Sequence, residues 1–397
     1  MHLPSPVEQP VSAAQTLKSK GKIRNRIQRL HLLSTLIVGV LVLAVSLSGA
    51  VAVFLYPAQH LFLSHLYQVT ASSQPVSIDE AVKTVKQAYP AATLEQVTTR
   101  PHDAYHFGLT DPTTERYFQV FVDPGTGKIN GDYRQDDWII GWITSFHQTL
   151  FASGIKLPFG ITLDVLLFTI AGIALLIMVC TGAYLWFPGI KRFLNGFKLR
   201  ASNSQLIRHY DWHKLMGILA LPWLFMWALS GLLIANRPLI PTWNAMVFSA
   251  APESAPKVYS VPNGQPAISF EEARRIAATA TGYPVTMTVL AADATSPITV
   301  GVEKPGYHLW KYWEYPGTHD VLIDQYSGKV LSVFEYPTYP LSFNALFGIH
   351  MAASPSPGWR ILWSFFGAMP FVLAYTGLSM GWIKRQQRLE RKRLRRQ

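Results

Sequence analysis

Four long apolar stretches constrain what this chain can fold into. They lie near residues 30–56, 161–187, 214–235 and 359–382, and each is long enough to cross a bilayer, which takes about 20 helical residues. Only 15% of the 397 residues are charged, against roughly 25% in ordinary soluble domains. The sequence therefore predicts an α-helical membrane protein with four transmembrane helices.

The distribution of Lys and Arg predicts the orientation of these helices. Three flanking segments are strongly basic: residues 18–29 carry six basic residues and no acid, 188–208 carry five and no acid, and 384–397 carry eight and one acid. Residues 57–137 and 236–349 instead carry more acidic than basic side chains. Because basic residues collect on the cytoplasmic side, we expect both termini to be cytoplasmic and the two large segments to face the other side, which for a bacterial inner membrane is the periplasm. The net charge of +12 then reflects topology, and we expect no nucleic-acid partner.

This order divides the chain into nine segments. They are a cytoplasmic basic segment (1–29), helix one (30–56), a first periplasmic domain (57–146), a ligand segment with helix two (147–187), a cytoplasmic basic loop (188–211), helix three (212–235), a second periplasmic domain (236–349), a ligand segment with helix four (350–383) and a cytoplasmic basic tail (384–397).

The two halves of this arrangement share motifs, which indicates a tandem internal repeat. The first and third apolar stretches both carry a histidine followed eighteen residues later by Ser-Gly, and the second and fourth end in Thr-Gly. The matched positions are His31 and His213, Gly49 and Gly231, Gly182 and Gly377.

The large segments between the spans also resemble each other. Residues 76–90 and 268–284 read as short amphipathic helices, each with a Ser followed by Glu three residues on, the capping-box pattern (Ser77 with Glu80, Ser269 with Glu272). Alternating apolar strands that run into Asp- and Gly-containing turns follow at residues 116–129 and 319–331. Each segment is predicted to be a small α+β domain.

These turns and their surroundings resemble the PepSY-associated transmembrane family. The chain reads Asp-Pro-Gly-Thr-Gly-Lys at residues 123–128 and Asp-Gln-Tyr-Ser-Gly-Lys at 324–329, with Gln325 where the family usually has proline. The resemblance extends from about residue 23 to 385 and implies two PepSY-like domains and a role in iron acquisition. Its closest type is the inner-membrane ferric-siderophore reductase.

Four histidines recur at equivalent places and are the candidate metal ligands. His31 and His213 open the outbound spans, and His147 and His350 precede the inbound ones. Taken singly, each of these histidines is explained simply by a position at the membrane interface. Their occurrence as two matched pairs favours a function. Two imidazoles are too few for zinc, which needs three or four protein ligands, and they suit the axial positions of haem iron. Because no CxxCH motif is present, we predict two b-type haems, held by His31 with His213 near the cytoplasm and His147 with His350 near the periplasm.

Glycine and arginine positions extend this hypothesis. Eighteen residues are five helical turns, so Gly49 and Gly231 lie on the faces of His31 and His213, about 27 Å away, where they would leave room for the second haem. Gly182 and Gly377 would do the same beside the cytoplasmic haem, although small residues also let helices pack. Arg360, on the acidic side, is the candidate partner of a haem propionate.

The predicted function is transfer of electrons across the membrane. There is no GxGxxG fingerprint, so the electron donor would be a separate cytoplasmic flavin or flavin reductase. By resemblance, the acceptor would be a ferric siderophore. The aromatic run at 306–320 would dock it or simply form a buried strand.

Two alternatives stay open: a permease or binding protein for a metal chelate, and a regulatory PepSY membrane protein without redox activity. His209, one turn before His213, is the alternative ligand.

Overall fold

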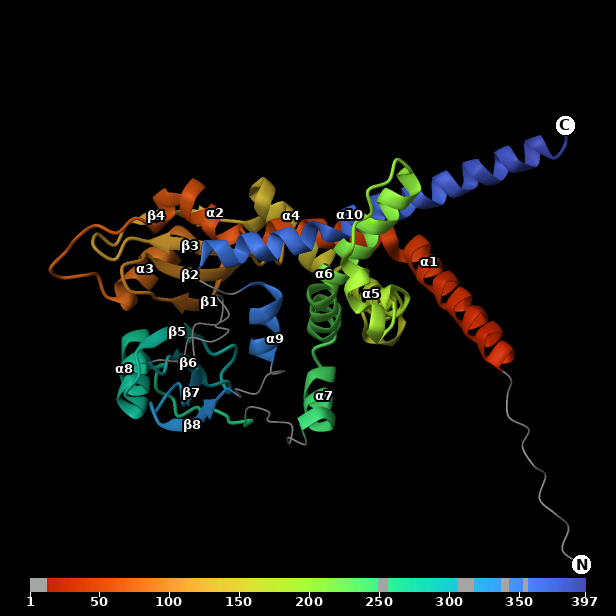
Figure 1. The fold of residues 1–397 in the computed structure, drawn as a ribbon. Coiled ribbons are helices and arrows are strands. Elements are labelled where there is room, and N and C mark those ends of the chain that lie inside the picture. The colour runs from red at the N-terminus through yellow and green to blue at the C-terminus, as the bar shows by residue number, and fades with distance from the viewer. Residues whose placement is uncertain (1–12, 249–255, 306–317, 337–342, 353–355) are drawn as a thin grey trace, which may run out of the picture. The chain divides into compact units, whose positions relative to one another are not determined.

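A computed structural model describes residues 13–248, 256–305, 318–336, 343–352 and 356–397 (Figure 1). The aromatic run at 306–320 lies largely outside these residues, as does His308. The principal elements are α1 (Ala13–Ala52), α2 (Leu55–Phe62), η1 (Ser64–Tyr67), α3 (Ile78–Ala88), β1 (Thr93–Thr98), β2 (Tyr105–Thr110), β3 (Tyr117–Val122), β4 (Ile129–Tyr133), η2 (Gln135–Asp137), α4 (Ile139–Thr149), η3 (Pro158–Gly160), α5 (Leu163–Trp186), η4 (Ile190–Phe197), α6 (Gln205–Ala235), α7 (Leu239–Phe248), α8 (Phe270–Thr281), β5 (Val285–Val289), β6 (Ile298–Val302), β7 (His319–Ile323), β8 (Val330–Glu335), α9 (Phe343–His350) and α10 (Pro357–Leu394).

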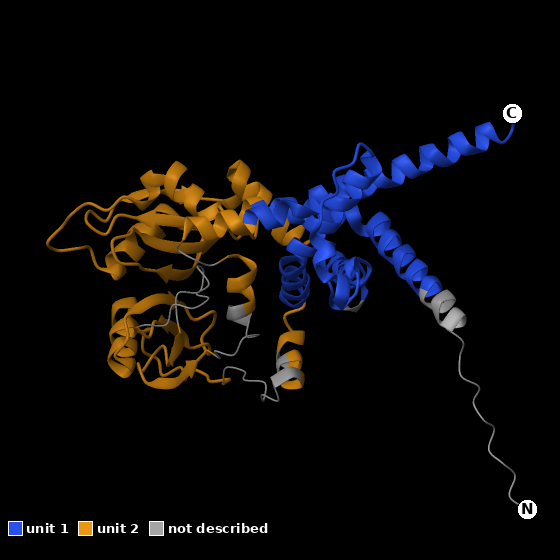
Figure 2. Ribbon diagram, in the orientation of Figure 1, with its two compact units in different colours: residues 1–50, 155–235, 364–397 blue, residues 51–154, 236–363 orange. Residues whose placement is uncertain are grey.

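The chain divides into two compact units, each built from separate stretches of sequence (Figure 2). Unit 1 contains residues 1–50, 155–235 and 364–397, and unit 2 contains residues 51–154 and 236–363. The long apolar helices make up unit 1, and the strands all fall in unit 2.

Unit 1 contains four helices that are long and apolar enough to cross a membrane. They are Gly21–Ala52, Leu163–Trp186, Gln205–Ala235 and Pro357–Leu394, which confirms the four predicted spans. Aliphatic side chains on α1 point outward, and Ile37 and Val40 are 78% and 84% exposed. Such a surface is stable against lipid and not against water. The chain is therefore a membrane protein.

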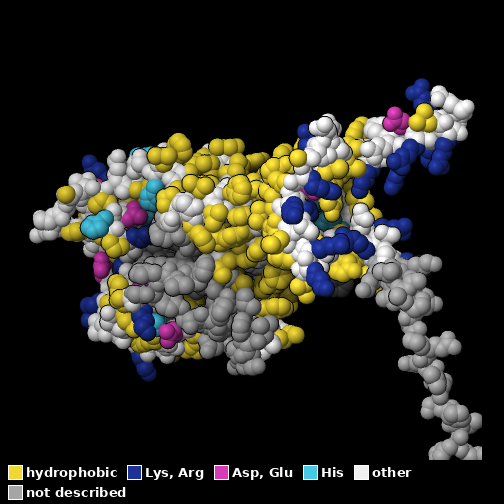
Figure 3. Space-filling model, in the orientation of Figure 1, with side chains coloured by type: hydrophobic (Ala, Val, Ile, Leu, Met, Phe, Trp, Pro, Cys, Tyr) yellow, Lys and Arg dark blue, Asp and Glu magenta, His cyan; other side chains and the backbone are white. Residues whose placement is uncertain are grey.

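Three of these helices are longer than the apolar stretches that predict them. α1 begins at Ala13, α6 begins at Gln205, and α10 continues to Leu394, so each extends through basic sequence. Lys and Arg are good helix formers, and nothing in these flanks interrupts the hydrogen-bonding pattern. Lys and Arg side chains line the C-terminal part of α10 (Figure 3).

Small residues bring the helices of unit 1 close together. A Cβ at Gly172 of α5 would lie 3.1 Å from the Cβ of Leu232 in α6, and one at Gly367 of α10 would lie 3.2 Å from the Cβ of Ala50 in α1. The Ser364 hydroxyl also donates to the Ala50 carbonyl at 2.8 Å. Close backbone approach of this kind is the usual basis of helix association in membranes.

Unit 2 is built on one antiparallel sheet of eight strands in the order β4-β3-β2-β1-β5-β6-β7-β8. The sequence analysis treats the two segments as separate domains, and the structure joins their strands through β1 and β5. In that pairing Val97 lies opposite Thr288 and Thr98 lies opposite Met287. A pairing between residues almost 200 positions apart leaves no local sequence signal.

Each half of the sheet is covered by its own amphipathic helix. α3 buries Ala81 and Val85 against Val97, Phe107 and neighbouring side chains of β1–β3. α8 buries Ala273 and Ala277 against the apolar side chains of β6 and β7. Helix and strand periodicities thus place their apolar faces together, as the sequence predicts.

The N-termini of these two helices are capped, but in different ways. Ser77 and Glu80 form the predicted capping box at α3. At α8 the Ser269 hydroxyl accepts from the Glu272 N–H. The return bond of a capping box, from the Ser269 N–H to the Glu272 carboxylate, is not formed among the described residues, so this part of the prediction is wrong. The Glu272 carboxylate instead accepts from Arg275 at 2.6 and 2.9 Å, because an arginine one turn later offers two charged donors.

The two helices also cap each other. The backbone N–H of Ile78 in α3 donates to the Glu271 carboxylate of α8 at 2.9 Å. In return, the N–H of Phe270 in α8 donates to the Asp79 carboxylate of α3 at 2.9 Å. A carboxylate at a helix N-terminus satisfies an unpaired N–H and interacts favourably with the helix dipole.

An aspartate at each predicted turn ties the incoming chain to the sheet. Asp123 accepts hydrogen bonds from the backbone N–H groups of Thr70 and Gly125 and from the Thr126 hydroxyl. Burial alone would raise the pKa of Asp123, but the bonds from Thr70, Gly125 and Thr126 outweigh it and lower the pKa to about 2.

Asp324 makes the corresponding contacts in the second turn. Its carboxylate accepts from the N–H groups of Val261, Tyr326 and Ser327 and from the Ser327 hydroxyl. The bond from the Ser327 N–H comes first among the causes that lower the pKa of Asp324 to about 2. Gln325, where proline is usual, donates its N–H to the Ser260 hydroxyl and its amide to two carbonyls.

Candidate functional site

His31 of α1 is held by a threonine of α5. Its Nδ1 lies 2.9 Å from the Thr181 hydroxyl oxygen. That hydroxyl donates its own hydrogen to the Ile177 carbonyl one turn back, so it accepts from the imidazole. His31 is therefore the Nδ1–H tautomer, and its lone pair is on Nε2.

His213 of α6 is held in the same way by α10. Its Nδ1 lies 3.0 Å from the Thr376 hydroxyl and 3.1 Å from the Leu373 carbonyl. A carbonyl oxygen only accepts, and the Thr376 hydroxyl donates to the Val372 carbonyl. Both contacts require a proton on Nδ1, so the Nε2 of His213 also carries the lone pair that a metal ion binds.

The two imidazoles approach each other inside unit 1. The ring centroids of His31 and His213 are 6.5 Å apart, and the ring planes are nearly perpendicular at 89°. Two imidazole rings that bind one metal ion from opposite sides through bonds of about 2 Å have centres roughly 6 Å apart. The centroid separation and the tautomers are compatible with both imidazoles binding a single metal ion.

Gly182 and Gly377 lie against these imidazoles. A Cβ at Gly182 would be 3.4 Å from Cε1 of His31, and a Cβ at Gly377 would be 3.5 Å from Cε1 of His213. Each Thr-Gly pair therefore bonds one edge of an imidazole through the threonine and packs against it through the glycine. Gly49 and Gly231 are half-buried, and the serines before them are buried; their predicted role beside a haem stays a prediction.

His147 and His350 come together in unit 2. His147 is in the last turn of α4 and His350 is the last residue of α9. Their ring centroids are 6.1 Å apart, with an angle of 33° between planes. Burial, followed by the nearby His147, lowers the pKa of His350 to about 3, so this imidazole is neutral at pH 7, the form that binds a metal ion.

The backbone after each of these two helices is strained. Leu150 and Phe151 follow α4 with φ of 50° and 53°, and Ala352 follows α9 with φ of 53°. Non-glycine residues avoid this left-handed region, and they keep it where the surrounding structure imposes it, often at functional sites. The Trp363 indole N–H donates to the Ile349 carbonyl at 3.0 Å, which fixes the residue before His350.

Arg360 has a structural contact. Its guanidinium, 9% exposed, donates to the Val53 carbonyl at 2.9 Å, just beyond the end of α1. A cation at this place stabilises a helix C-terminus. The predicted contact with a propionate stays a prediction.

Other histidines lie outside the two pairs. The ring of His209 packs against Tyr375 at 5.6 Å. His106 and His319 are each 8% exposed. His106 lies 3.4 Å from the Asp103 carboxylate, but its buried Nε2 makes no hydrogen bond among the described residues. His319 bonds the Thr318 hydroxyl at 2.8 Å.

Among the described residues, no group of three or more His, Cys, Asp or Glu side chains is placed to hold a metal ion. A metal at either pair would therefore need most of its ligands from elsewhere. A porphyrin supplies four nitrogens and leaves two axial positions. The described residues thus fit haem, and they do not fit a zinc site.

A cavity of about 500 Å³ lies in unit 2. Gln148, the neighbour of His147 in α4, lines it. Amides, phenols and one guanidinium dominate the rest of its wall: Gln59, Gln96, Gln119, Gln135, Tyr56, Tyr67, Tyr117, Tyr133 and Arg100. Such a wall offers many hydrogen bonds and little charge, which suits a polar chelate of moderate size.

Thr181 and Thr376 contact the candidate ligands His31 and His213, and the sequence analysis gives them no role. The matched Thr-Gly pairs are visible in the sequence, but only the glycines are assigned a role. The sequence shows a threonine at the same place in both halves. It does not show which histidine each threonine bonds, and the role of the threonine depends on that contact.

Four membrane helices and an α+β region with paired histidines define the class of this protein. A comparison with protein families matches residues 28–385 to the PepSY-associated TM region. The chain belongs to this family. No curated protein sequence matches the chain with significance.

Proposed function

We propose that this protein is a haem-dependent oxidoreductase of the bacterial inner membrane. It passes electrons from a cytoplasmic donor, a flavin or flavin reductase, to a ferric siderophore in the periplasm and releases ferrous iron. The proposal rests on two pairs of facing imidazoles. The ring centroids of His31 and His213 are 6.5 Å apart, and those of His147 and His350 are 6.1 Å apart. The haems would supply one-electron chemistry, and reduction weakens binding of iron by hard oxygen ligands.

The residues of the chain have three tasks in this proposal. His31 with His213, and His147 with His350, each hold one iron from two sides. Thr181 and Thr376 fix the tautomer and the ring orientation of the first couple. The amide- and tyrosine-rich cavity of unit 2 would receive the chelate through hydrogen bonds.

The matching contacts of the two halves support the proposed tandem repeat. In both, a span histidine bonds a threonine of the following span, and an aspartate turn binds the chain that precedes a helix. The permease alternative requires breaks in the spans, yet α6 continues through Pro222 and α10 through Pro370. A regulatory function leaves the bonded histidines without a purpose.

An absorption spectrum of the detergent-purified protein tests the proposal. We expect two low-spin b-type haems per chain by the pyridine haemochrome assay, with bands that sharpen on reduction. A protein that is colourless after growth with ample haem precursor would contradict electron transfer.

Replacing Thr181 by valine tests the orientation of His31. Valine keeps the shape and removes the acceptor of the Nδ1–H, so we expect haem affinity at that couple to fall about 10- to 100-fold. Haem retention during titration with apomyoglobin measures the change. Thr169→Val is the matched control on α5, because the Thr169 hydroxyl donates to the Val165 carbonyl of its own helix. Equal retention in both variants would contradict the assignment.

A further inference from the structure

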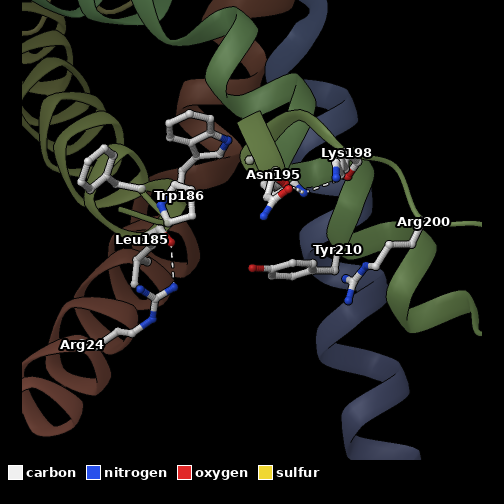
Figure 4. Close-up of a pocket in the computed structure, with 11 residues that line it drawn as sticks. Arg24, Leu185, Trp186, Asn195, Lys198, Arg200 and Tyr210 are labelled. Atoms are coloured by element: carbon white, nitrogen blue, oxygen red, sulfur yellow. Dashed lines mark hydrogen bonds between the residues drawn. The ribbon is translucent and has the colours of Figure 1, made fainter. Parts of the chain in front are cut away.

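A second cavity, of about 460 Å³, lies in unit 1 and is strongly basic (Figure 4). Four cations line it: Arg24 of α1, Lys198 and Arg200 of the segment before α6, and Lys214 of α6. The remaining wall comes from the end of α5 and from η4, with Leu185, Trp186 and Asn195. Nothing in the proposed function so far uses this cavity.

Among the described residues, the cations of the cavity outnumber the carboxylates that pair with them. Asp211, 1% exposed, accepts from Arg200 at 2.9 and 3.0 Å and lies 3.7 Å from the Lys214 ammonium. Asp211 thus pairs with two of the four cations, and no ion pair of Arg24 or Lys198 is found in the part of the chain that the structure describes. Arg24 donates to the Leu185 carbonyl at 2.8 Å and Lys214 to the carbonyls of Asn195 and Lys198, contacts that orient the cations without neutralising them. The cavity therefore attracts an anion.

Tyr210 and Trp186 add aromatic rings and a hydrogen-bond donor to the wall of this cavity. The Tyr210 ring, 45% exposed, lies between the Arg200 side and the Arg24 side of the cavity (Figure 4). The Nε1–H of Trp186 is buried and has no hydrogen-bond partner among the described residues. A buried donor without a partner costs free energy unless a ligand or water satisfies it.

The loop around Trp186 is built for close contact. A Cβ at Gly196 would lie only 2.5 Å from Cζ2 of the indole, so no larger residue fits there. Phe193 and Phe197 contact the same indole edge to face, with centroids 5.4 and 5.2 Å away. The indole is thus fixed in place, which is the preorganisation expected of a binding wall.

The cavity lies at the same end of the helices as the first histidine couple. Lys214 follows His213 directly, and Leu185 is one turn beyond Gly182. Arg24 precedes His31 by seven residues, or about 10 Å along the helix. A ligand in the cavity is therefore near His31 and His213.

We infer that this cavity binds flavin mononucleotide, the phosphate on the cations and the planar ring against Tyr210 and Trp186. The inference rests on the proposed function, for which it supplies the site of the electron donor. Reduced flavin mononucleotide, regenerated by a cytoplasmic reductase, gives up two electrons and two protons. The electrons reduce two ferric ions to ferrous, one each, and the protons pass to cytoplasmic water.

Binding of oxidised flavin mononucleotide to the full chain in nanodiscs of zwitterionic lipid tests the site, by calorimetry and by quenching of flavin fluorescence. We expect Arg24→Ala and Lys198→Ala each to weaken binding about tenfold, the usual effect of a lost charged contact. Arg26→Ala is the matched control, because Arg26 is on the same helix and does not line the cavity; its effect should stay within about twofold.

Two further comparisons test the phosphate and the ring. Riboflavin, which lacks the phosphate, should bind at least about tenfold more weakly and be insensitive to Arg24→Ala. Trp186→Phe keeps an aromatic ring but removes the N–H, and it should weaken the binding of flavin mononucleotide. Gel filtration of the variant shows whether it is still folded. Equal losses in the Arg24 and Arg26 variants would overturn the site. So would complete competition by phosphatidylglycerol nanodiscs with no effect of Trp186→Phe, the result expected if a lipid headgroup occupies the cavity.

Haem content is recorded on the same samples. Specific flavin binding in a protein without haem would contradict the proposed function and leave the binding site intact. Two haems in a protein that does not bind flavin mononucleotide would overturn the site alone.

Discussion

His350→Ala is expected to reduce the haem content of the purified protein from two per chain to one. His350 faces His147 with 6.1 Å between ring centroids, so the substitution leaves one imidazole of this pair. With one axial ligand left, a b-type haem has no covalent bond to retain it. The pyridine haemochrome assay gives the stoichiometry.

The remaining haem is expected to keep its low-spin spectrum. His31 and His213 belong to the other compact unit, and their contacts with Thr181 and Thr376 do not involve His350. His213→Ala should show the reverse, with loss of the first haem and retention of the second. His65→Ala is the control, since His65 is an exposed histidine of unit 2. Loss of both haems in a folded protein, or retention of both, would contradict the pairing.

The sequence predicts the spans and singles out the four paired histidines because both signals are local. Four apolar stretches identify four helices, and one imidazole in each otherwise apolar motif is conspicuous. The structure then brings together the same two pairs of histidines. That these pairs bind haem stays a prediction.

The contacts that orient the site could not be predicted, because they join residues far apart in the chain. Thr181 is 150 residues from His31, and the basic cavity collects side chains from α1, α5, η4 and α6. Their proximity depends on how the helices pack, and packing leaves no periodic signal in the sequence. The reciprocal capping by Glu271 and Asp79 is hidden for the same reason.

Gln325 shows the limit of family patterns. At the position where proline is usual, the sequence analysis gives no specific role to glutamine. In the structure its N–H donates to the Ser260 hydroxyl at 3.0 Å, a bond that proline cannot make. Its amide also donates to the carbonyls of Asp293 and Ser296 at 2.9 Å. The departure from the pattern is a local gain of three hydrogen bonds.

Asp324→Ala is expected to destabilise the sheet of unit 2 by about 3 kcal/mol, the upper end of the usual effect of a single substitution, because it breaks a buried hydrogen-bond network. The carboxylate is 4% exposed and accepts four hydrogen bonds, from Val261, Tyr326 and Ser327. Removing it leaves three backbone N–H groups without their acceptor. Hydrogen exchange of the β6 and β7 amides in the full chain measures the loss. Asp132→Ala is the control, because the Asp132 side chain is 42% exposed, and its effect should stay below about 1 kcal/mol.

The same carboxylate predicts how stability depends on pH. The Ser327 N–H and the other donors lower the pKa of Asp324 to about 2, whereas an unfolded aspartate titrates near 3.9. A group whose pKa is lower in the folded state stabilises that state above its unfolded pKa, and this stabilisation is lost as pH falls through the folded pKa. Protection of the β6 and β7 amides should therefore fall between about pH 4 and pH 2 in the native protein. In Asp324→Ala that decline should be shallower, with Asp123 accounting for what remains; an unchanged slope would show that the turn carboxylates do not control acid stability.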